Sequence, residues 1–381
     1  MPALRIIHID TEMGYSGGEL QLFLLLEGLR SRGHHVLLTC RPGSACEHEA
    51  QRHGVECRTV SMRNQTDLPA VLRLRREMLA TRADLVHLHS SRANWLGGLA
   101  ARAAGVPAVS TRRMDRRVRP GMRNRFLYRV LLRRTAAVSP AVRDLLLEGG
   151  VPPERVEIIV DAVDPERLRP RHPRDEIRAR LGAGSEHFVA IAVAALVRRK
   201  GLDVLLDSIG GLGAARMRLL VWIVGEGSER NALEQRARQI GVASQISFLG
   251  WRDDVADLLN AADVAVLPSR REGMGVAALE AMAAGRAVIA SNVGGLAHAV
   301  VHERTGLLVS PGDPTTLASA LARLIRDPDL RQRLAAEGPK RIAAGFLPEQ
   351  MVTAYEKLYM RVLSERQEVA PPSLAGKGAG E

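Results

Sequence analysis

Two glutamates bracket a glycine-containing loop in the second half of the chain. Glu272 and Glu280 stand in REGMGVAALEAMAAG, where Gly-Met-Gly precedes an Ala-rich helix that is expected to end at Gly285. At ~1.5 Å per residue, Glu280 lies ~7–8 Å along this helix, the reach from a diphosphate at the helix N-terminus to the ribose of a nucleotide. Glu272 would lie beyond the phosphates, on the side of a sugar. The alternative is a solvated Glu280, although Ala277 and Ala281 are expected to share its helix face.

A lysine and a pair of glycines extend the hypothesis of a phosphate site. Lys200 is the only lysine in the first 339 residues, and it follows Arg198 and Arg199 at the end of an apolar run. An ammonium is a compact point charge that suits a phosphate. The alternative is that this lysine is present by chance. Gly17 and Gly18 precede a helical run, where they would let the backbone approach a ligand or would merely form a tight turn. The segment GYSGGE lacks the third glycine of a dinucleotide fingerprint, which disfavours an NAD enzyme.

Cysteines, histidines and paired aspartates give little sign of metal or redox chemistry. The three cysteines form no C-x-x-C pair, so neither a disulfide framework nor a zinc site is indicated. His89 shares a strand face with His87 and is a candidate for the active site, although such a histidine is more often structural. The single Asp-x-Asp, Asp327 to Asp329, heads a helical run and is expected to cap it.

Composition narrows the class of protein. The 381 residues favour two domains, and no run of apolar residues is long enough to span a membrane. The N-terminus lacks the features of a secretion signal, so we expect a cytoplasmic protein. The net charge of +12 comes from an arginine-rich composition, because only four of the 54 basic residues are lysines. Aromatic residues make up 3% of the chain, too few for stacking on bases, so nucleic acid is not an expected partner.

Short apolar strands alternate with helical runs along most of the chain. This rhythm predicts an α/β fold with parallel sheets covered on both faces. A charged stretch with three prolines, 164–185, predicts a linker, with domains at 1–165 and 166–346. A last amphipathic helix, 347–366, is expected to return to the first domain, and the tail 367–381 is expected to be disordered. The expected strands are 4–10, 34–40, 83–91, 107–113, 136–140 and 156–161 in the first half, and 188–196, 218–227, 245–250, 264–269, 286–291 and 305–310 in the second.

The order of these motifs resembles that of the retaining GT-B glycosyltransferases of family 4. The resemblance runs from GGELQLFLLLEGLRSRGHHV through VSPAVRDLL, VGEGSERNALE and ISFLGWRDDVADLLNAADVAVLPS to the E-x7-E motif and TGLLVSPGD. It implies the GT-B architecture, two Rossmann-like doubly wound sheets facing each other across a cleft. The family is metal-independent, so the resemblance implies no cofactor and a nucleoside diphosphate sugar as the donor.

The resemblance also assigns roles to residues. Glu272 would contact the donor sugar, and Glu280 the ribose. Four donor-binding residues form the loop and the start of its helix, namely Gly273, Met274, Gly275 and Val276. Lys200 would hold the diphosphate with them, Trp251 and Arg252 would meet the base, and Gly17 and Gly18 would face phosphate or acceptor.

Several positions depart from the family pattern, and two of these departures bear on the candidate site. Ala195 replaces the arginine usual five residues before the motif lysine, so Arg198 or Arg199 would take over that phosphate contact. Arg113 stands near the position of a frequent active-site histidine, which makes Arg113, together with His89, a candidate catalytic residue.

These observations favour an enzyme that transfers a sugar, with retention, to a cell-envelope glycolipid of lipopolysaccharide-core type or to a polysaccharide. Two alternatives are a non-catalytic protein that binds nucleotide sugars and a nucleotide-sugar epimerase or dehydrogenase, whose fingerprint and Tyr-x-x-x-Lys pair are absent.

One arginine-rich segment suggests a location for the enzyme. Residues 112–134 hold ten arginines and one aspartate, and a helix from Met122 would align Arg125, Arg129 and Arg133 in a stripe. Phe126, Leu127, Val130 and Leu131 would lie on its other side. We expect peripheral attachment of this stripe to the anionic inner face of the membrane, with a solvated helix face as the alternative.

Overall fold

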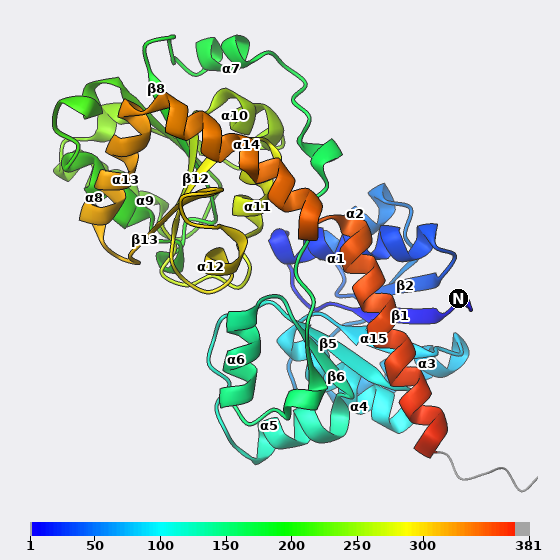
Figure 1. The fold of residues 1–381 in the computed structure, drawn as a ribbon. Helices are drawn as coiled ribbons and strands as arrows, with labels where there is room; N and C mark the ends of the chain where they lie inside the picture. The colour runs from blue at the N-terminus through cyan, green and yellow to red at the C-terminus, as the bar shows by residue number, and fades with distance from the viewer. Residues whose placement is uncertain (1, 370–381) are drawn as a thin grey trace, which may run out of the picture.

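The computed structural model describes residues 2–369 as two α/β domains, each built on one parallel sheet (Figure 1). The N-terminal sheet has seven strands in the order β3-β2-β1-β4-β5-β6-β7. The strands are β1 (Arg5–Ile9), β2 (His35–Cys40), β3 (Cys57–Thr59), β4 (Leu85–Leu88), β5 (Ala108–Arg112), β6 (Arg134–Ala137) and β7 (Val156–Ile158). The connecting helices are α1 (Gly17–Ser31), α2 (Ala45–Arg52), α3 (Leu68–Ala80), α4 (Ser91–Ala104), α5 (Met122–Phe126), which continues as a π-helical turn (Leu127–Leu131), and α6 (Pro140–Glu148). The sheet confirms the six expected strands and adds the short edge strand β3.

The C-terminal sheet has six strands in the order β10-β9-β8-β11-β12-β13, all of them expected from the sequence. They are β8 (Phe188–Val193), β9 (Leu219–Val224), β10 (Ile246–Gly250), β11 (Val264–Leu267), β12 (Ala287–Ser291) and β13 (Gly306–Val309). The helices are α7 (Arg174–Arg180), α8 (Leu202–Gly210), α9 (Arg230–Gln239), α10 (Val255–Ala261), α11 (Val276–Ala283), α12 (Leu296–Ala299), α13 (Pro314–Arg326) and α14 (Pro328–Gly345). Asp327 caps α14 by accepting a hydrogen bond from the Leu330 amide at 2.8 Å, as expected of that Asp-x-Asp.

The chain passes between the domains twice at one place. The Val163 amide donates to the Phe346 carbonyl at 2.9 Å, so the outgoing and returning segments lie side by side. The last helix, α15 (Pro348–Val369), then packs along α1 of the N-terminal domain (Figure 1). The two helices approach closely at Gly28, where an added Cβ would lie 2.3 Å from a methyl group of Val352.

The predicted linker 164–185 is too wide. Its second half forms α7, in which Arg174 and Arg178 donate hydrogen bonds to the carboxylate of Asp263 in the C-terminal domain. Arg178 is buried, and it also donates to the carbonyl of Ala261 at 3.1 Å. The predicted start of the tail at 367 is also early, because α15 continues to Val369; residues 370–381 lie outside the described part of the chain.

The arginine-rich segment differs from the expected single helix. It changes from α5 to a π-helical turn at Leu127. Leu127 and Leu131 are buried as expected, whereas Phe126 and Val130 are 43% and 45% exposed. The stripe residues Arg125, Arg129 and Arg133 are exposed as well. Phe126 and Val130 therefore lie on the surface together with the stripe, and not on an opposite, buried side.

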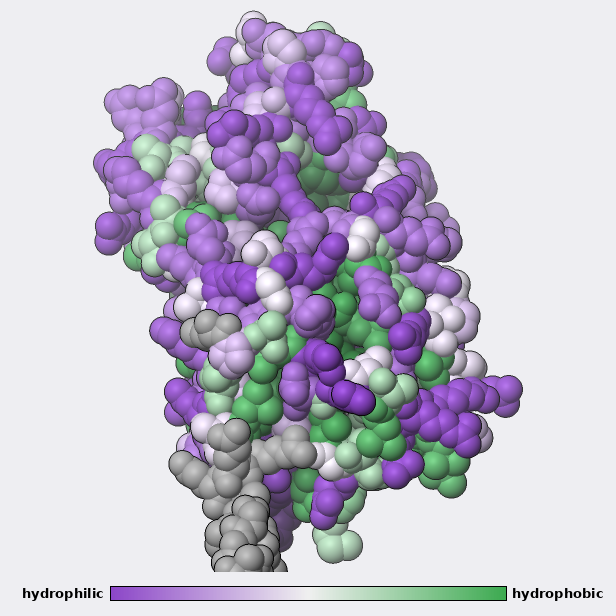
Figure 2. Space-filling model, turned by 90° about the vertical axis from the view of Figure 1, so that its right-hand side faces the viewer, coloured by the Kyte–Doolittle hydropathy of each residue, from purple (hydrophilic) through white to green (hydrophobic). Residues whose placement is uncertain are grey.

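Hydrophilic side chains cover most of the face shown in Figure 2, with hydrophobic ones visible mainly in its lower half. Among the helices of residues 2–369, none combines the length and the apolar character needed to cross a bilayer.

Candidate functional site

The E-x7-E motif occupies the loop after β11 and the first turns of α11. Gly275 is the N-cap of α11 with φ of +88°, a left-handed conformation that glycine adopts without strain. The free amides of the first turn of α11 follow directly, as an anion site at a helix N-terminus requires. Met274 is 2% exposed and packs in the core, so only its backbone is available to a donor. The loop backbone rests on Gly294, where an added Cβ would lie 1.9 Å from the Glu272 carbonyl oxygen.

The carboxylate of Glu272 is held by residues from two neighbouring loops. The Lys200 ammonium donates to Glu272 Oε2 at 2.5 Å, and the Ser269 hydroxyl donates to the same oxygen at 3.1 Å. Arg199 lies 3.8 Å from the other carboxylate oxygen. Lys200 is placed by the turn after β8, where Gly201 has φ of +65° and its Cα approaches the Pro268 carbonyl so closely that a side chain would collide. The structure therefore brings Lys200, Arg199 and Glu272 together, as the phosphate-site hypothesis requires.

Glu280 lies on α11, five residues after the N-cap. Burial raises the pKa of its carboxyl group to about 7. Hydrogen bonds from a ligand would stabilise the ionised carboxylate and lower this pKa. The side chain is half-buried, as is that of Ala277 on the expected shared face. Ala281 does not share that face, because it is fully buried in the core. Val276, the first residue of α11, is half-buried at the contact with the N-terminal domain.

The remaining donor-site candidates are more exposed. Arg198 is exposed, and Ala195, the position that departs from the family, is exposed too. Trp251 is 68% exposed at the end of β10, an edge strand of the sheet. Arg252 donates two hydrogen bonds to the carboxylate of Asp254, one of them at 2.7 Å, so a base would meet an ion pair and not a free guanidinium.

The N-terminal domain meets the loop through the carboxyl ends of its strands, the usual place for ligands in open α/β sheets. Arg113, just after β5, has its carbonyl oxygen 2.0 Å from the position of an added Cβ on Gly273. The Ser139 hydroxyl donates to the Gly273 carbonyl at 2.7 Å. Gly17 and Gly18 form the first turn of α1 behind the N-cap Ser16. An added Cβ on Gly17 would lie 3.7 Å from Val276, and one on Gly18 would lie 3.6 Å from the Arg113 side chain.

Hydrogen bonds hold two nitrogens of the Arg113 guanidinium, and the third nitrogen is buried without a partner among the described residues. Its Nε lies 3.3 Å from the buried carboxylate of Asp161, and its Nη1 lies 3.5 Å from His89 Nδ1. Its Nη2 is buried, and it has no hydrogen-bond partner among the described residues. A buried guanidinium N–H without a partner can donate to a hydroxyl of a bound sugar. Sequence reasoning missed Asp161 and Ser139, because nothing local links them to Arg113 and Gly273.

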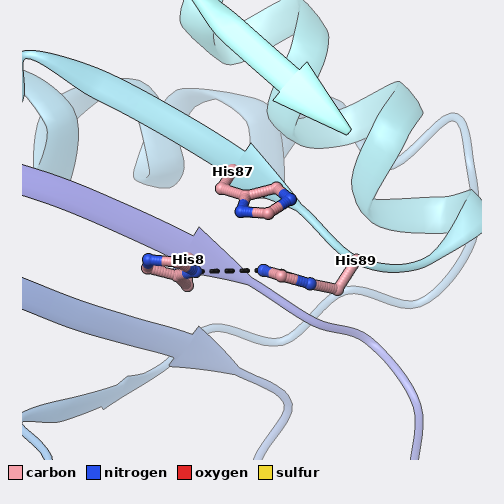
Figure 3. Close-up of side chains that lie close together, drawn as sticks. All are labelled: His8, His87 and His89. Atoms are coloured by element: carbon pink, nitrogen blue, oxygen red, sulfur yellow. Dashed lines mark hydrogen bonds between the residues drawn. The ribbon is translucent and has the colours of Figure 1, made fainter. Parts of the chain in front are cut away.

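His8, His87 and His89 form a cluster at the ends of β1 and β4 (Figure 3). His8 Nδ1 and His89 Nε2 share a hydrogen bond of 3.0 Å. Because a guanidinium only donates, His89 Nδ1 must accept from Arg113, and its proton lies on Nε2. Both nitrogens of His89 are therefore engaged, which favours a role in positioning Arg113 over a catalytic one. Burial lowers the pKa of His8 to about 3 and the pKa of the other two well below its usual value, so the cluster is neutral.

The same cluster is the one group of three potential metal ligands found among residues 2–369, with ligand atoms within 4.8 Å of one another. In this arrangement the two nitrogens of His87 bond the hydroxyls of Tyr359 and Thr111, each at 2.7 Å. A cation would have to displace these bonds and the His8–His89 bond, and it would lie near the positive charge of Arg113. The cluster is better suited to a hydrogen-bonded network than to a metal centre.

Comparisons with known proteins agree with this geometry. Residues 15–167 match the family described as Glycosyltransferase Family 4, and residues 173–341 match the family described as Glycosyl transferases group 1. A D-inositol 3-phosphate glycosyltransferase of Jonesia denitrificans is 33% identical over 304 residues, which cover 73% of this chain and 72% of that protein. A lipopolysaccharide core biosynthesis glycosyltransferase, LpsD of Rhizobium meliloti, is 33% identical over 200 residues, 52% of this chain and 57% of the relative.

Solved structures share the whole architecture. The crystal structure of Anabaena HepE in complex with UDP-glucose superposes with a TM-score of 0.83, covering 94% of this chain and all of that one at 22% identity. This likeness shows the fold alone, and the resemblance in sequence to the longer-matching relatives shows the family. Two parallel-sheet domains, the E-x7-E loop at their junction and the matches along both halves lead to one conclusion: the chain is a GT-B glycosyltransferase and belongs to family 4.

Proposed function

We propose that this enzyme transfers a sugar from a nucleoside diphosphate sugar to a cell-envelope glycolipid or polysaccharide acceptor of lipopolysaccharide-core type. In this proposal the configuration at the anomeric carbon is retained and no metal takes part. The observation that carries it is the contact of Lys200 with Glu272 beside the N-terminus of α11. A cation, free helix amides and two carboxylates at this spacing match the parts of a sugar nucleotide in order. The Anabaena structure contains UDP-glucose, and the rhizobial relative is named for lipopolysaccharide core biosynthesis.

The proposed chemistry depends on stabilising the departing diphosphate. As the bond from the anomeric carbon to the diphosphate breaks, negative charge grows on the phosphate oxygens. Lys200, Arg199 and the first amides of α11 would share this charge, and each such contact contributes about 2–4 kcal/mol to the transition state. Glu272 would release Lys200 to the phosphate and accept hydrogen bonds from the sugar, while Arg113 Nη2 would donate to the sugar from the opposite domain.

We infer further that the enzyme attaches to the inner face of the cytoplasmic membrane. The supporting observation is a surface of mixed character on α5 and its π-helical turn. Met122, Phe126 and Val130 are 86%, 43% and 45% exposed, and they recur every four residues next to the stripe of exposed arginines. Apolar side chains with flanking arginines are typical of segments that lie in the interface of an anionic membrane.

A donor screen with a stereochemical readout tests the proposed reaction. The purified full chain is incubated with UDP-, GDP- and ADP-linked sugars, and the anomeric signal of the released sugar is followed by NMR from the first turnovers. We expect slow release from one donor class, with the donor's own anomeric configuration appearing first. Inverted product would contradict retention, and no thermal stabilisation by any nucleoside diphosphate or its sugars would contradict the donor class.

A further inference from the structure

The N-terminal domain has a hollow of about 1160 Å³ beside the residues described above. It is lined by the loop after β1, the end of β2, the loop before α3, the first half of α4, and α5. Ser91 on its wall follows His89 by two residues, so the hollow begins at the edge of the sheet from which Arg113 and His89 also project. It is therefore a separate space next to the proposed donor site, on the domain opposite the E-x7-E loop.

The charge of the hollow is its distinctive property. Arg41, Arg92 and Arg123 line it, with Glu12 as the one carboxylate in the lining, which leaves an excess of two positive charges. Within residues 2–369, none of the three guanidiniums forms an ion pair. Arg92 donates to the backbone carbonyl of Met62 at 2.9 Å.

The hollow also has an apolar wall. The Arg123 guanidinium lies 4.7 Å from the centre of the Trp95 ring and donates a hydrogen bond to the Gln65 side chain. These contacts hold Arg123 in place, so less side-chain entropy is lost when it binds an anion. Trp95 is half-buried and presents part of an aromatic surface beside polar groups, a combination that suits the mixed faces of a sugar ring.

We infer that this hollow is the acceptor site and that it recognises a saccharide bearing an oxyanion, either a phosphate or a carboxylate. Guanidinium groups pair with both kinds of oxyanion through two parallel hydrogen bonds, and three of them without carboxylate partners have no other evident charge to neutralise. The inference rests on the proposed function, because it assumes that the neighbouring site holds the donor. It adds the chemical class of the acceptor, which the donor site does not determine.

The position of α5 fits this assignment. Arg123 faces the hollow from the short helix whose neighbours Met122 and Phe126 are exposed to the outside. With that surface on the membrane, a glycolipid acceptor in the same membrane would present its charged saccharide directly to Arg123. The same helix would then contact the membrane on one side and bind the acceptor on the other.

Calorimetric titration of the full chain with simple probes tests the inference. Glucose 6-phosphate and glucuronate represent the two sources of the oxyanion, and glucose and inorganic phosphate are the controls. We expect one or both anionic sugars to bind about tenfold more tightly than either control. Equal affinity for glucose, or inorganic phosphate binding as tightly as the sugar phosphate, would overturn the assignment of a charged-saccharide site.

Variants of the lining arginines test whether the anionic sugars bind in this hollow. Arg41→Gln is the main test, because the Arg41 side chain makes no hydrogen bond or ion pair within residues 2–369 and its loss should leave the fold intact. We expect Arg41→Gln and Arg123→Gln each to weaken the anionic sugar about tenfold. Arg102→Gln, at the exposed far end of α4, is the matched control and should change nothing. Unchanged binding in Arg41→Gln and Arg123→Gln would overturn the inference.

Nucleoside diphosphates separate this inference from the proposed function. They should bind the Arg41→Gln protein as tightly as the wild type and should not displace glucose 6-phosphate. If they bind normally while no anionic sugar binds, the acceptor inference fails and the donor proposal stands. If anionic sugars bind at Arg41 and no nucleoside diphosphate binds anywhere, the proposed function fails and the anion site remains.

Discussion

At the scale of single residues, Lys200 and Glu272 form the central pair of the proposed donor site. Their contact joins the turn after β8 to the loop after β11, across 72 positions of sequence. The isolation of Lys200 in an arginine-rich chain was a usable signal, because an ammonium is chosen where a guanidinium fork does not fit. Ser269 and Asp161 gave no comparable signal. Their importance depends on partners that only the folded chain brings near, at 3.1 Å and 3.3 Å.

Replacing Lys200 by methionine should lower the turnover of the donor. The change removes one cation from the departing diphosphate, a loss of about 2–4 kcal/mol of transition-state stabilisation and therefore of about thirtyfold to a thousandfold in kcat. Steady-state kinetics with the best donor measures it. Lys340→Met, at an exposed surface ion pair, is the control. An unchanged kcat in Lys200→Met would show that Arg198 and Arg199 supply the charge without it.

Glu280 should make nucleotide binding depend on pH. Its pKa is about 7 in the free protein, and hydrogen bonds from ribose hydroxyls stabilise the carboxylate, so binding lowers that pKa. Affinity is then fully present above about pH 7 and is lost as the pH falls, by up to about tenfold per pH unit. Titrations of nucleoside diphosphate between pH 8 and pH 6, in wild type and Glu280→Gln, isolate this effect from the titration of the phosphate. Parallel profiles in the two proteins would refute the ribose role.

At the scale of elements, the strands were the most predictable part of the chain. Buried parallel strands read as continuous apolar runs, and twelve of the thirteen were expected. The edge strand β3 has three residues and is partly exposed, so it lacked that pattern. The length of the linker was overestimated for a similar reason. The prolines and charges before α7 indicate a loop, whereas the pairing of its arginines with Asp263 is a long-range effect.

The three histidines at the ends of β1 and β4 should make the stability of the fold depend on pH. His8, His87 and His89 are neutral in the folded protein because burial lowers each pKa. Unfolding lets them take up protons below their ordinary pKa of about 6.5, so stability is present above that pH and falls by about 1.4 kcal/mol per pH unit for each histidine. His8→Leu removes one of the three and should lose stability less steeply.

Urea unfolding of wild type and His8→Leu between about pH 7.5 and pH 5.5 measures the two pH dependences. The two proteins are compared because buried carboxylates, which both contain, titrate as well. His8→Leu also removes the acceptor of the His89 Nε2 hydrogen bond, so the test compares the pH slopes of the two proteins and not their absolute stabilities. The exposed His48 provides the control, His48→Leu. Identical pH slopes for wild type and His8→Leu would contradict a buried, neutral cluster.

The surface on α5 and its π-helical turn makes a prediction about membrane binding. The full chain should sediment with vesicles containing anionic lipid at low salt and should be released at high salt, because each arginine near the surface contributes about 1 kcal/mol. Changing Arg125, Arg129 and Arg133 together to glutamine should abolish binding. Phe126→Ser should weaken it at all salt concentrations, because that side chain is apolar. Binding that survives the triple change would leave the stripe a solvated face.

At the scale of the whole molecule, the proposed function depends on placing two sheet edges against each other. Neither domain holds the complete proposed site, since Lys200, Glu272 and Glu280 come from one and Arg113 from the other. The order of motifs was enough to predict two sheets and the family. The orientation of Arg113 could not be predicted, because it depends on Asp161 and His89 inside one domain and on the contact of its backbone with Gly273 in the other.

The central claim is that α11 and its preceding loop bind the nucleotide of a sugar donor. Calorimetric titration of wild type, Glu280→Ala and the control Glu186→Ala with the most stabilising nucleoside diphosphate tests it most directly. We predict that Glu280→Ala weakens binding by about tenfold to a hundredfold, as expected for a charged hydrogen bond worth about 1.5–3 kcal/mol, with an unchanged circular dichroism spectrum and an unaffected control. Equal dissociation constants in wild type and Glu280→Ala would contradict the account.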